Sequence, residues 1–270
     1  MAHIVRTYTL PLLPKGAHDI RILHFSDLHI SPAKKTLIKD IESWIDLKPD
    51  LVVSTGDFLA HKDGIKLVIK ALDKLLDIPG LFVFGSNDYY GPKFKNPFLY
   101  LLPDRGERKL GEELNWRLLK KKLTARGWKD LNHNKVKLRI KNVVIEARGT
   151  DDAHLELDNY PLVKGKKSRS ADIAIGVTHA PYERVLTAMA SDKLDLIFAG
   201  HTHGGQVRLP WPGGSKALTT NCDLDNWRAS GLSKVNDEPW LSVSAGMGTS
   251  PYAPIRFACP AEISLIILTA

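Results

Sequence analysis

The stretch Leu196-Ile197-Phe198-Ala199-Gly200-His201-Thr202-His203-Gly204-Gly205 decides the fold and points to the chemistry. Its first four residues are apolar and predict a short buried strand. The glycines that follow allow a sharp turn at the end of that strand, where two imidazoles stand two residues apart. Neutral imidazoles are suitable ligands for Zn, Fe, Mn or Ni. For this run alone, two surface histidines in a glycine-rich turn are the alternative.

The same arrangement, an apolar strand followed closely by Asp, His or Asn, occurs four more times. Ligands of open α/β sheets lie beyond the carboxyl ends of the strands, so the five strand ends should converge. Five ends that carry metal-ligand residue types are far more specific than one. The four further strands are Ile20–Phe25 before Asp27 and His29, Leu51–Ser54 before Asp57, 81–84 before Asn87, and 173–178 before His179.

Strands and helices alternate along the chain without repeats and without a linker. Helical spacing over 33–47 and 62–76 predicts a βαβαβ run with parallel strands and right-handed crossovers. With 270 residues, 43% of them hydrophobic, the chain can bury a large core without disulfides. We therefore expect a single domain over residues 1–270. Its second half should add a hairpin and two further strands, at 136–140 and 143–147, at 240–244, and at 262–268.

The cysteines and the apolar stretches bear on the cellular compartment. Cys222 and Cys259 match no metal or redox spacing, so we expect free thiols in a reducing compartment. No stretch has the length of a membrane span, and the N-terminus has no apolar signal region. The expected location is the cytoplasm, with peripheral association with a membrane as an addition.

Five groups of residues together resemble the signature of the calcineurin-like metallophosphoesterases, and most closely a small bacterial subgroup with a GHTHGGQ run. The tail segments 245–250 and 254–257 resemble that subgroup too. The likeness extends from Ile20 to the C-terminus and is weakest in the middle third. It implies an α/β fold, an αββα sandwich of two packed mixed β-sheets with helices on the outer faces, and metal-dependent hydrolysis of phosphoric esters. The groups are Asp27-Leu28-His29, Gly56-Asp57, Gly85-Ser86-Asn87-Asp88, His179 and Gly200-His201-Thr202-His203.

The resemblance also implies a centre of two divalent or trivalent metal ions, with Mn, Fe or Zn as candidates. Two ions about 3.5–4 Å apart lower the pKa of a bound water and neutralise the phosphoryl oxygens. Asp57 would bridge the ions, and we expect Asp57, Asn87 and His203 to act in catalysis. The implied ligands are Asp27, His29, Asp57 and His203 for the first ion, and Asp57, His179, His201 and a side chain of the 85–88 turn for the second.

That turn departs from the family pattern of Gly-Asn-His followed by Asp or Glu. An ungapped comparison puts Ser86 in the metal-binding position and Asn87 in the histidine position, whereas a one-residue slip lets Asn87 bind the metal. We prefer Asn87, because an amide oxygen is a better acceptor than a neutral hydroxyl. The usual proton donor is then missing, which predicts a substrate with an activated leaving group. The histidines that would supply a proton from elsewhere are His24, His61, His133 and His154.

Positive charge is concentrated in one segment, residues 93–141. It holds 15 Lys or Arg against 5 Asp or Glu, while the whole chain has a net charge of +8. Because the segment leaves from the turn that carries Asn87, we expect a basic cap around 93–141 that covers the mouth of the site. Basic residues mixed with aromatics suit anionic lipid headgroups, and no nucleic-acid-binding motif accompanies them. The alternative is a solvated helical face.

Together these features predict a dinuclear phosphohydrolase, either a phosphodiesterase or a pyrophosphatase, that acts on a lipid-linked or nucleotide substrate. Its expected partners are a phosphoester small molecule or lipid and, at the periphery, an anionic membrane, with nucleic acid not favoured. One alternative is a phosphomonoesterase. The other is a non-catalytic binding module that keeps the metal.

Overall fold

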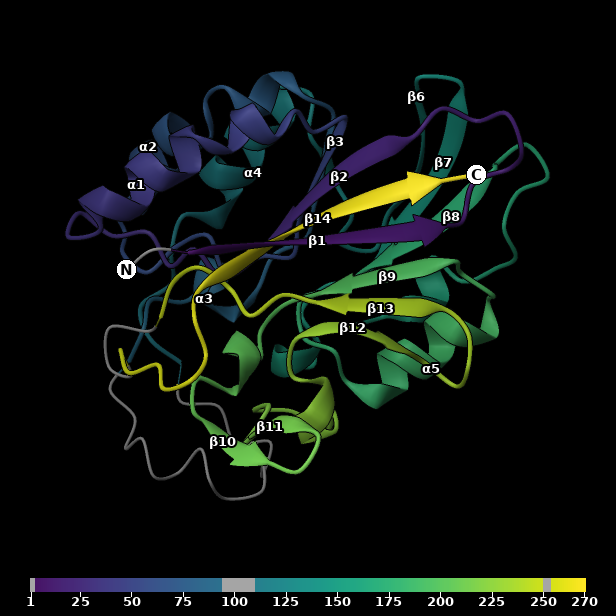
Figure 1. Cartoon of the computed structure of the whole chain (residues 1–270). Coiled ribbons are helices and arrows are strands. Elements are labelled where there is room, and N and C mark those ends of the chain that lie inside the picture. Colours follow the sequence, from purple (N-terminus) through teal and green to yellow (C-terminus); the bar gives the residue numbers. More distant parts are fainter. Residues whose placement is uncertain (1–2, 94–109, 250–253) are drawn as a thin grey trace.

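Two six-stranded sheets packed face to face make up the centre of the computed structural model, which describes residues 3–93, 110–249 and 254–270 (Figure 1). In the first sheet four neighbouring strands, β2 to β5, are parallel, β14 is antiparallel to β2, and β1 is parallel to β14. The order across this sheet is β1 (Ile4–Pro11), β14 (Glu262–Thr269), β2 (Ile20–Phe25), β3 (Leu51–Ser54), β4 (Gly80–Phe82) and β5 (Lys129–Asp130).

The second sheet has a parallel centre and an antiparallel strand at each edge. The order across it is β12 (Gly231–Lys234), β13 (Trp240–Val243), β9 (Leu196–Ala199), β8 (Ile173–Val177), β7 (Val143–Gly149) and β6 (Lys135–Ile140). A separate two-stranded hairpin, outside both large sheets, consists of β10 (Arg208–Trp211) and β11 (Gly214–Ala217).

Side chains alternate along each strand and fill three apolar layers. Ile22 of β2 and Phe198 of β9 belong to the buried apolar layer between the two sheets. On the outer side of the first sheet, Phe25 packs in a layer with α1, α2 and α4. On the outer side of the second sheet, Ile197 packs with α5. The αββα sandwich with helices outside is therefore confirmed.

Five α-helices and several 3₁₀ turns connect the described strands. The helices are α1 (Lys35–Glu42), α2 (Gly64–Leu72), the one-turn α3 (Ser86–Tyr89), α4 (Trp116–Ala125) and α5 (Glu183–Ser191). The 3₁₀ turns are Trp44–Leu47, Leu75–Asp77, Ala153–Leu155, Tyr160–Leu162, His203–Gly205 and Asn226–Arg228. No helix among the described residues has both the length and the apolar character needed to cross a lipid bilayer.

The predicted helices 33–47 and 62–76 are present, but each is shorter than predicted and continues as a 3₁₀ turn. The first of these turns ends at Lys48, whose backbone is left-handed (φ 50°) and which precedes Pro49, so the helix cannot continue. The hairpin of β6 and β7 confirms the pairing predicted around Lys141 and Asn142. Strand β1, helix α5 and the β10–β11 hairpin were not predicted.

Much of the basic segment 93–141 belongs to the layers of the fold. Helix α4 buries Leu119 and Leu123 in the outer layer of the first sheet, and β5 and β6 are edge strands of the two sheets. A cap over the site would therefore rest mainly on residues 94–109. These lie outside the described residues, so the cap stays a prediction.

Candidate metal centre

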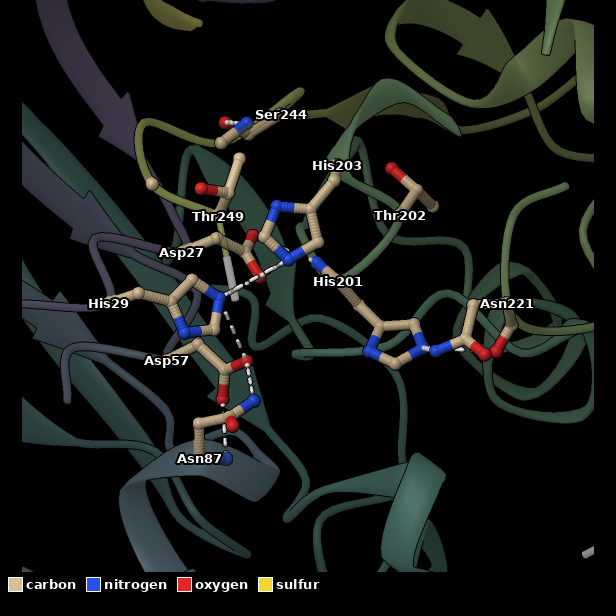
Figure 2. A network of polar contacts seen from close by, with 12 residues as sticks. Asp27, His29, Asp57, Asn87, His201, Thr202, His203, Asn221, Ser244 and Thr249 are labelled. Carbon is tan, nitrogen blue, oxygen red and sulfur yellow. Dashed lines mark hydrogen bonds and ion pairs between the residues drawn. The ribbon is translucent and has the colours of Figure 1, made fainter. Parts of the chain in front are cut away.

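The predicted ligands of both sheets meet at one end of the sandwich. Asp27 and His29 follow β2, Asp57 follows β3, and Asn87 lies in α3 just after β4, all from the first sheet. From the second sheet, His179 follows β8, while His201 and His203 follow β9. In Figure 2 the side chains of Asp27, His29, Asp57 and His203 point toward one another.

Asp27, His29 and His203 form the first group that can hold a metal ion. The Nε2 atoms of the two histidines are 3.2 Å apart, and Asp27 Oδ1 lies 3.8 Å from His29 Nε2 and 3.5 Å from His203 Nε2. Asp27 Oδ1 is buried and accepts no hydrogen bond. Burial lowers the pKa of both imidazoles well below the usual value, so both rings are neutral and each can offer a lone pair to a cation.

Asp57, His179 and again Asp27 form the second group. Asp57 Oδ2 lies 3.6 Å from His179 Nε2 and also 3.6 Å from His29 Nε2 of the first group. Asp27 belongs to both groups, and one oxygen of Asp57 is equally distant from an imidazole of each, so both carboxylates are candidates for a bridge.

A hydrogen bond to the backbone fixes the ring orientation of His179. Its Nδ1 lies 2.6 Å from the carbonyl oxygen of Thr55, which makes Nδ1 the protonated donor and turns Nε2 toward Asp57. That Nε2 is buried and makes no hydrogen bond. Burial lowers the pKa of His179, but the carboxylates of Asp57, Asp152 and Asp27 outweigh it and raise the pKa to about 9.

His201, from the same glycine-rich turn, belongs to neither group, but its ring centroid lies 5.2 Å from that of His179. Its backbone N–H donates to Asp27 Oδ2, and its Nε2 lies 3.1 Å from the carbonyl oxygen of Asn221 (Figure 2). Coordination by His201 would therefore use Nδ1. The loop 221–226, which is rich in Asn and Asp, thus supplies a residue that orients this ring.

Five of the seven predicted ligands have left-handed backbones, a conformation that costs a non-glycine residue energy. Such strain persists only where the surrounding structure holds it, and it gathers at functional sites. The left-handed backbone directs successive side chains toward the site from turns that are too short for a helix or a strand. The five are Asp27 (φ 53°), His29 (φ 44°), Asp57 (φ 55°), His201 (φ 67°) and His203 (φ 50°).

Two glycines allow the strand ends to come this close. A Cβ on Gly85 would lie 2.3 Å from Asp57 Oδ1, and a Cβ on Gly200 would lie 1.9 Å from Ser26 Oγ. Both distances are far inside van der Waals contact, so a side chain at either position would push β4 or β9 out of place. The glycines in the predicted motifs are thus required by packing around the ligands.

Asn87 is the residue of the 85–88 turn that faces Asp57. Its side-chain amide donates to Asp57 Oδ2 at 2.7 Å, and its backbone N–H donates to Oδ1 at 2.8 Å (Figure 2). Rotation of the amide by half a turn would direct its oxygen to the same place. This geometry supports the choice of Asn87 over Ser86 as the ligand from this turn.

Asp88, the next residue, was not predicted to have a role. It is fully buried, and its two oxygens accept four backbone N–H groups, those of Asp57, Phe58, Leu59 and Gly85. Burial and the nearby Asp57 raise the pKa of Asp88, yet both oxygens act as acceptors, which requires the ionised form. Asp88 therefore fixes the loop of Asp57 to α3.

Only one of the four remaining candidate histidines lies at the site. The His154 ring centroid is 4.4 Å from that of His201, and its Nδ1 contacts the hydroxyl of Tyr182. His24 is buried between the sheets, where burial lowers its pKa to about 3, as expected for a core histidine. The other two, His61 and His133, contact Asp63 and the Asn159 backbone.

Two cations brace the same end of the sandwich. The Arg256 guanidinium donates to the carbonyl oxygens of His203, Ala245, Gly246 and Gly248. Gly248 in turn donates to the Asp27 carbonyl oxygen, so Arg256 connects the tail to both metal-ligand loops. Lys34 donates to the Thr249 carbonyl oxygen, and burial lowers its pKa to about 8.

The donor set fits metal ions. Neutral imidazoles and carboxylates, with buried lone pairs that point to common positions, are the ligands that Mn, Fe and Zn accept. Without a cation, Asp27 Oδ1 and His179 Nε2 would stay buried and unpaired, which is costly.

Comparison with known proteins agrees with this geometry. The family model of the calcineurin-like phosphoesterases matches residues 20–205, the range that holds every predicted ligand. The phosphodiesterase YaeI of Escherichia coli is 26% identical over 268 residues, which cover 97% of this chain and 86% of YaeI. The UDP-2,3-diacylglucosamine pyrophosphatase LpxG of Chlamydia trachomatis is 39% identical over 75 residues, 27% of this chain and 22% of LpxG.

Among solved structures, the purple acid phosphatase PPD1 of yellow lupin has a similar fold. The TM-score is 0.50 with 12% sequence identity, and the match covers 91% of this chain and 47% of PPD1. At this identity the likeness shows the fold alone.

Proposed function

The chain belongs to the calcineurin-like phosphoesterase family, and from that membership we propose that it hydrolyses phosphodiester or pyrophosphate bonds at a centre of two metal ions. The observation that carries this proposal is the position of Asp57. One of its oxygens lies 3.6 Å from an imidazole of each ligand group, where a bridging carboxylate is needed to hold two cations close together.

We propose Asp27, His29, Asp57 and His203 as ligands of the first ion, and Asp57, Asn87, His179 and His201 as ligands of the second. When bound, the ions would neutralise the phosphoryl oxygens and lower the pKa of a coordinated water. Asp57 keeps the two positions adjacent, and Asp88 keeps Asp57 in place. His203 is the most exposed of the proposed ligand histidines, with 16% of its side chain open to solvent, so it is the imidazole best placed to contact substrate.

Support for a pyrophosphate or a diester with an activated leaving group comes from the 85–88 turn. With Asn87 as the metal ligand, this turn contains no histidine, and an amide cannot release an acidic proton. An alkoxide leaving group needs a proton, whereas the phosphate released from a pyrophosphate bond is already a stable anion. The names of YaeI and LpxG describe a phosphodiesterase and a pyrophosphatase, in line with this choice.

The test compares two chromogenic substrates with the same protein loaded with Mn²⁺. Turnover of bis-para-nitrophenyl phosphate should exceed turnover of para-nitrophenyl phosphate, and chelation should abolish both. Faster cleavage of the monoester would instead favour a phosphomonoesterase. If neither substrate were cleaved while two ions stayed bound, the proposed hydrolysis would be wrong.

A further inference from the structure

The β10–β11 hairpin carries its apolar face outward. Directly paired residues of neighbouring strands point to the same side, and Leu209 pairs with Lys216 while Trp211 pairs with Gly214. Leu209, Trp211 and Lys216 therefore share one face, where Leu209 is 42% and Trp211 55% exposed. The opposite face holds Ala217, which is 2% exposed. Figure 1 shows the hairpin apart from both large sheets, and the exposure of Leu209 and Trp211 shows that this face is open to solvent.

Two more aromatic side chains extend this face. Phe257, 57% exposed, bridges to Val207 in a parallel register, which puts its ring on the side of Val207 and Leu209. The Lys216 ammonium lies 5.8 Å from the ring centroid of Trp211 and 5.9 Å from that of Trp227. We call these five residues the aromatic hairpin face: Leu209, Trp211, Lys216, Trp227 and Phe257.

The charge near this face is positive on balance. From Gly204 to Arg228, a segment that includes four of its five residues, the chain has Arg208, Lys216 and Arg228 against Asp223 and Asp225. No described carboxylate forms an ion pair with Lys216. Tryptophan, aliphatic side chains and a lysine beside them form the combination that enters the headgroup region of a bilayer and pairs with its phosphates. The net charge of +8 adds attraction to an anionic surface.

Two arginines fix the face to the metal centre. Arg208, on the inner side of the hairpin, donates to the Gly204 carbonyl oxygen, and Arg256, next to Phe257, donates to the His203 carbonyl oxygen. The position of the hairpin is thus set by the turn that carries His203. A surface bound to this face would therefore contact a hairpin that is hydrogen-bonded to the turn of His203.

We propose that the aromatic hairpin face docks the protein on an anionic lipid bilayer. This goes beyond the proposed hydrolysis and does not depend on it. Leu209 and Trp211 enter the headgroup region, and Lys216 pairs with a lipid phosphate between the two tryptophan rings.

The test is sedimentation of the full chain with sucrose-loaded vesicles of phosphatidylcholine and phosphatidylglycerol at a ratio of 7:3. The double variant Leu209→Ser and Trp211→Ser should lower the partition coefficient about tenfold or more, because two large apolar contacts are lost. The matched control is Leu162→Ser, another highly exposed leucine, 65% exposed, away from the hairpin. It should bind as the unchanged protein does. Circular dichroism and the melting temperature confirm that both variants are folded.

Salt and charge give a second readout. Lys216→Gln should weaken binding to vesicles with phosphatidylglycerol but not to vesicles of phosphatidylcholine alone, and added salt should reduce the difference. The competing basic surface is tested by Lys121→Glu with Lys122→Glu in α4. The proposal is overturned if the unchanged protein does not bind, if the hairpin variant binds normally, or if only the α4 variant loses binding. Dimerisation through the hairpin face without vesicle binding would equally overturn it, in favour of a second copy as the partner.

Discussion

At the scale of single residues, Asp57 is where the two ligand groups meet. Asp57→Asn keeps the shape of the side chain but removes the anion between two cations, so activity should fall about a hundredfold or more and bound metal should be lost. The measurement is kcat together with metal content by mass spectrometry. Asp63→Asn, an exposed carboxylate 71% open to solvent, is the control and should change neither. Two bound ions and full activity in Asp57→Asn would refute the bridge.

His179 should make metal binding depend on pH. Its pKa of about 9 in the metal-free protein means that the ring is protonated at pH 7.5, while a metal ion requires the neutral form. Affinity should therefore rise with pH and level off above about pH 9, and binding at pH 7.5 should release about one proton. Calorimetry in two buffers of different ionisation enthalpy measures this proton. His29 and His203 have lowered pKa values and should add none. The same binding heat in both buffers would contradict the assignment.

Asn87 should make the rate sensitive to the leaving group. Without a proton donor, the rate should fall steeply as the leaving-group pKa rises in a series of aryl and alkyl diesters. Asn87→His should recover part of the 10²–10⁴-fold that general acid catalysis typically contributes for the poorest leaving groups. A shallow dependence in the unchanged protein would mean that another group donates. His154→Gln is then the decisive variant, because His154 is the candidate that contacts His201.

At the scale of elements, α3 and the loop after β3 are held together by one carboxylate. Asp88→Asn leaves two of four backbone N–H groups facing an amide NH₂, so the free energy of unfolding should fall by about 2–4 kcal/mol. Urea denaturation of the metal-free protein measures the loss apart from any effect on metal binding. Asp63→Asn serves again as the exposed control. Unfolding within about 0.5 kcal/mol of the unchanged protein would show that the N–H groups find other acceptors.

The strand ends were predictable because their pattern is local, an apolar run followed at once by ligand-type residues. The five strand ends converge as predicted, and the predicted hairpin of β6 and β7 is present. The roles of Asp88 and Arg256 were not predictable, since each depends on backbone groups brought together only by the folded chain. The β10–β11 hairpin was not predicted for a different reason. Its strands have only four residues each and β10 contains Pro210, so the sequence shows no clear alternation of apolar and polar residues.

At the scale of the whole molecule, the metal centre joins the two sheets. Strands of both sheets supply the proposed ligands, so bound ions would act as a cross-link that only the folded protein can form. Mn²⁺ at about one hundred times its dissociation constant should raise the melting temperature by roughly 5–10 °C, and chelation should reverse the rise. Asp57→Asn should show little of this shift. A melting temperature that neither metal nor chelator changes would mean that bound ions do not connect ligands of the two sheets.

The placement of β14 between β1 and β2 has a practical consequence for immobilising or labelling the protein. Because β14 runs antiparallel to β2, and β1 runs parallel to β14, Ile4 lies at the metal-centre end of the first sheet and Thr269 at the far end (Figure 1). A bead, dye or sensor chip coupled behind Thr269 leaves the catalytic end facing solvent. The same label attached ahead of Ile4 would lie at the metal-centre end of the sheet. Bulky substrates should therefore reach the site less easily when the label precedes Ile4 than when it follows Thr269.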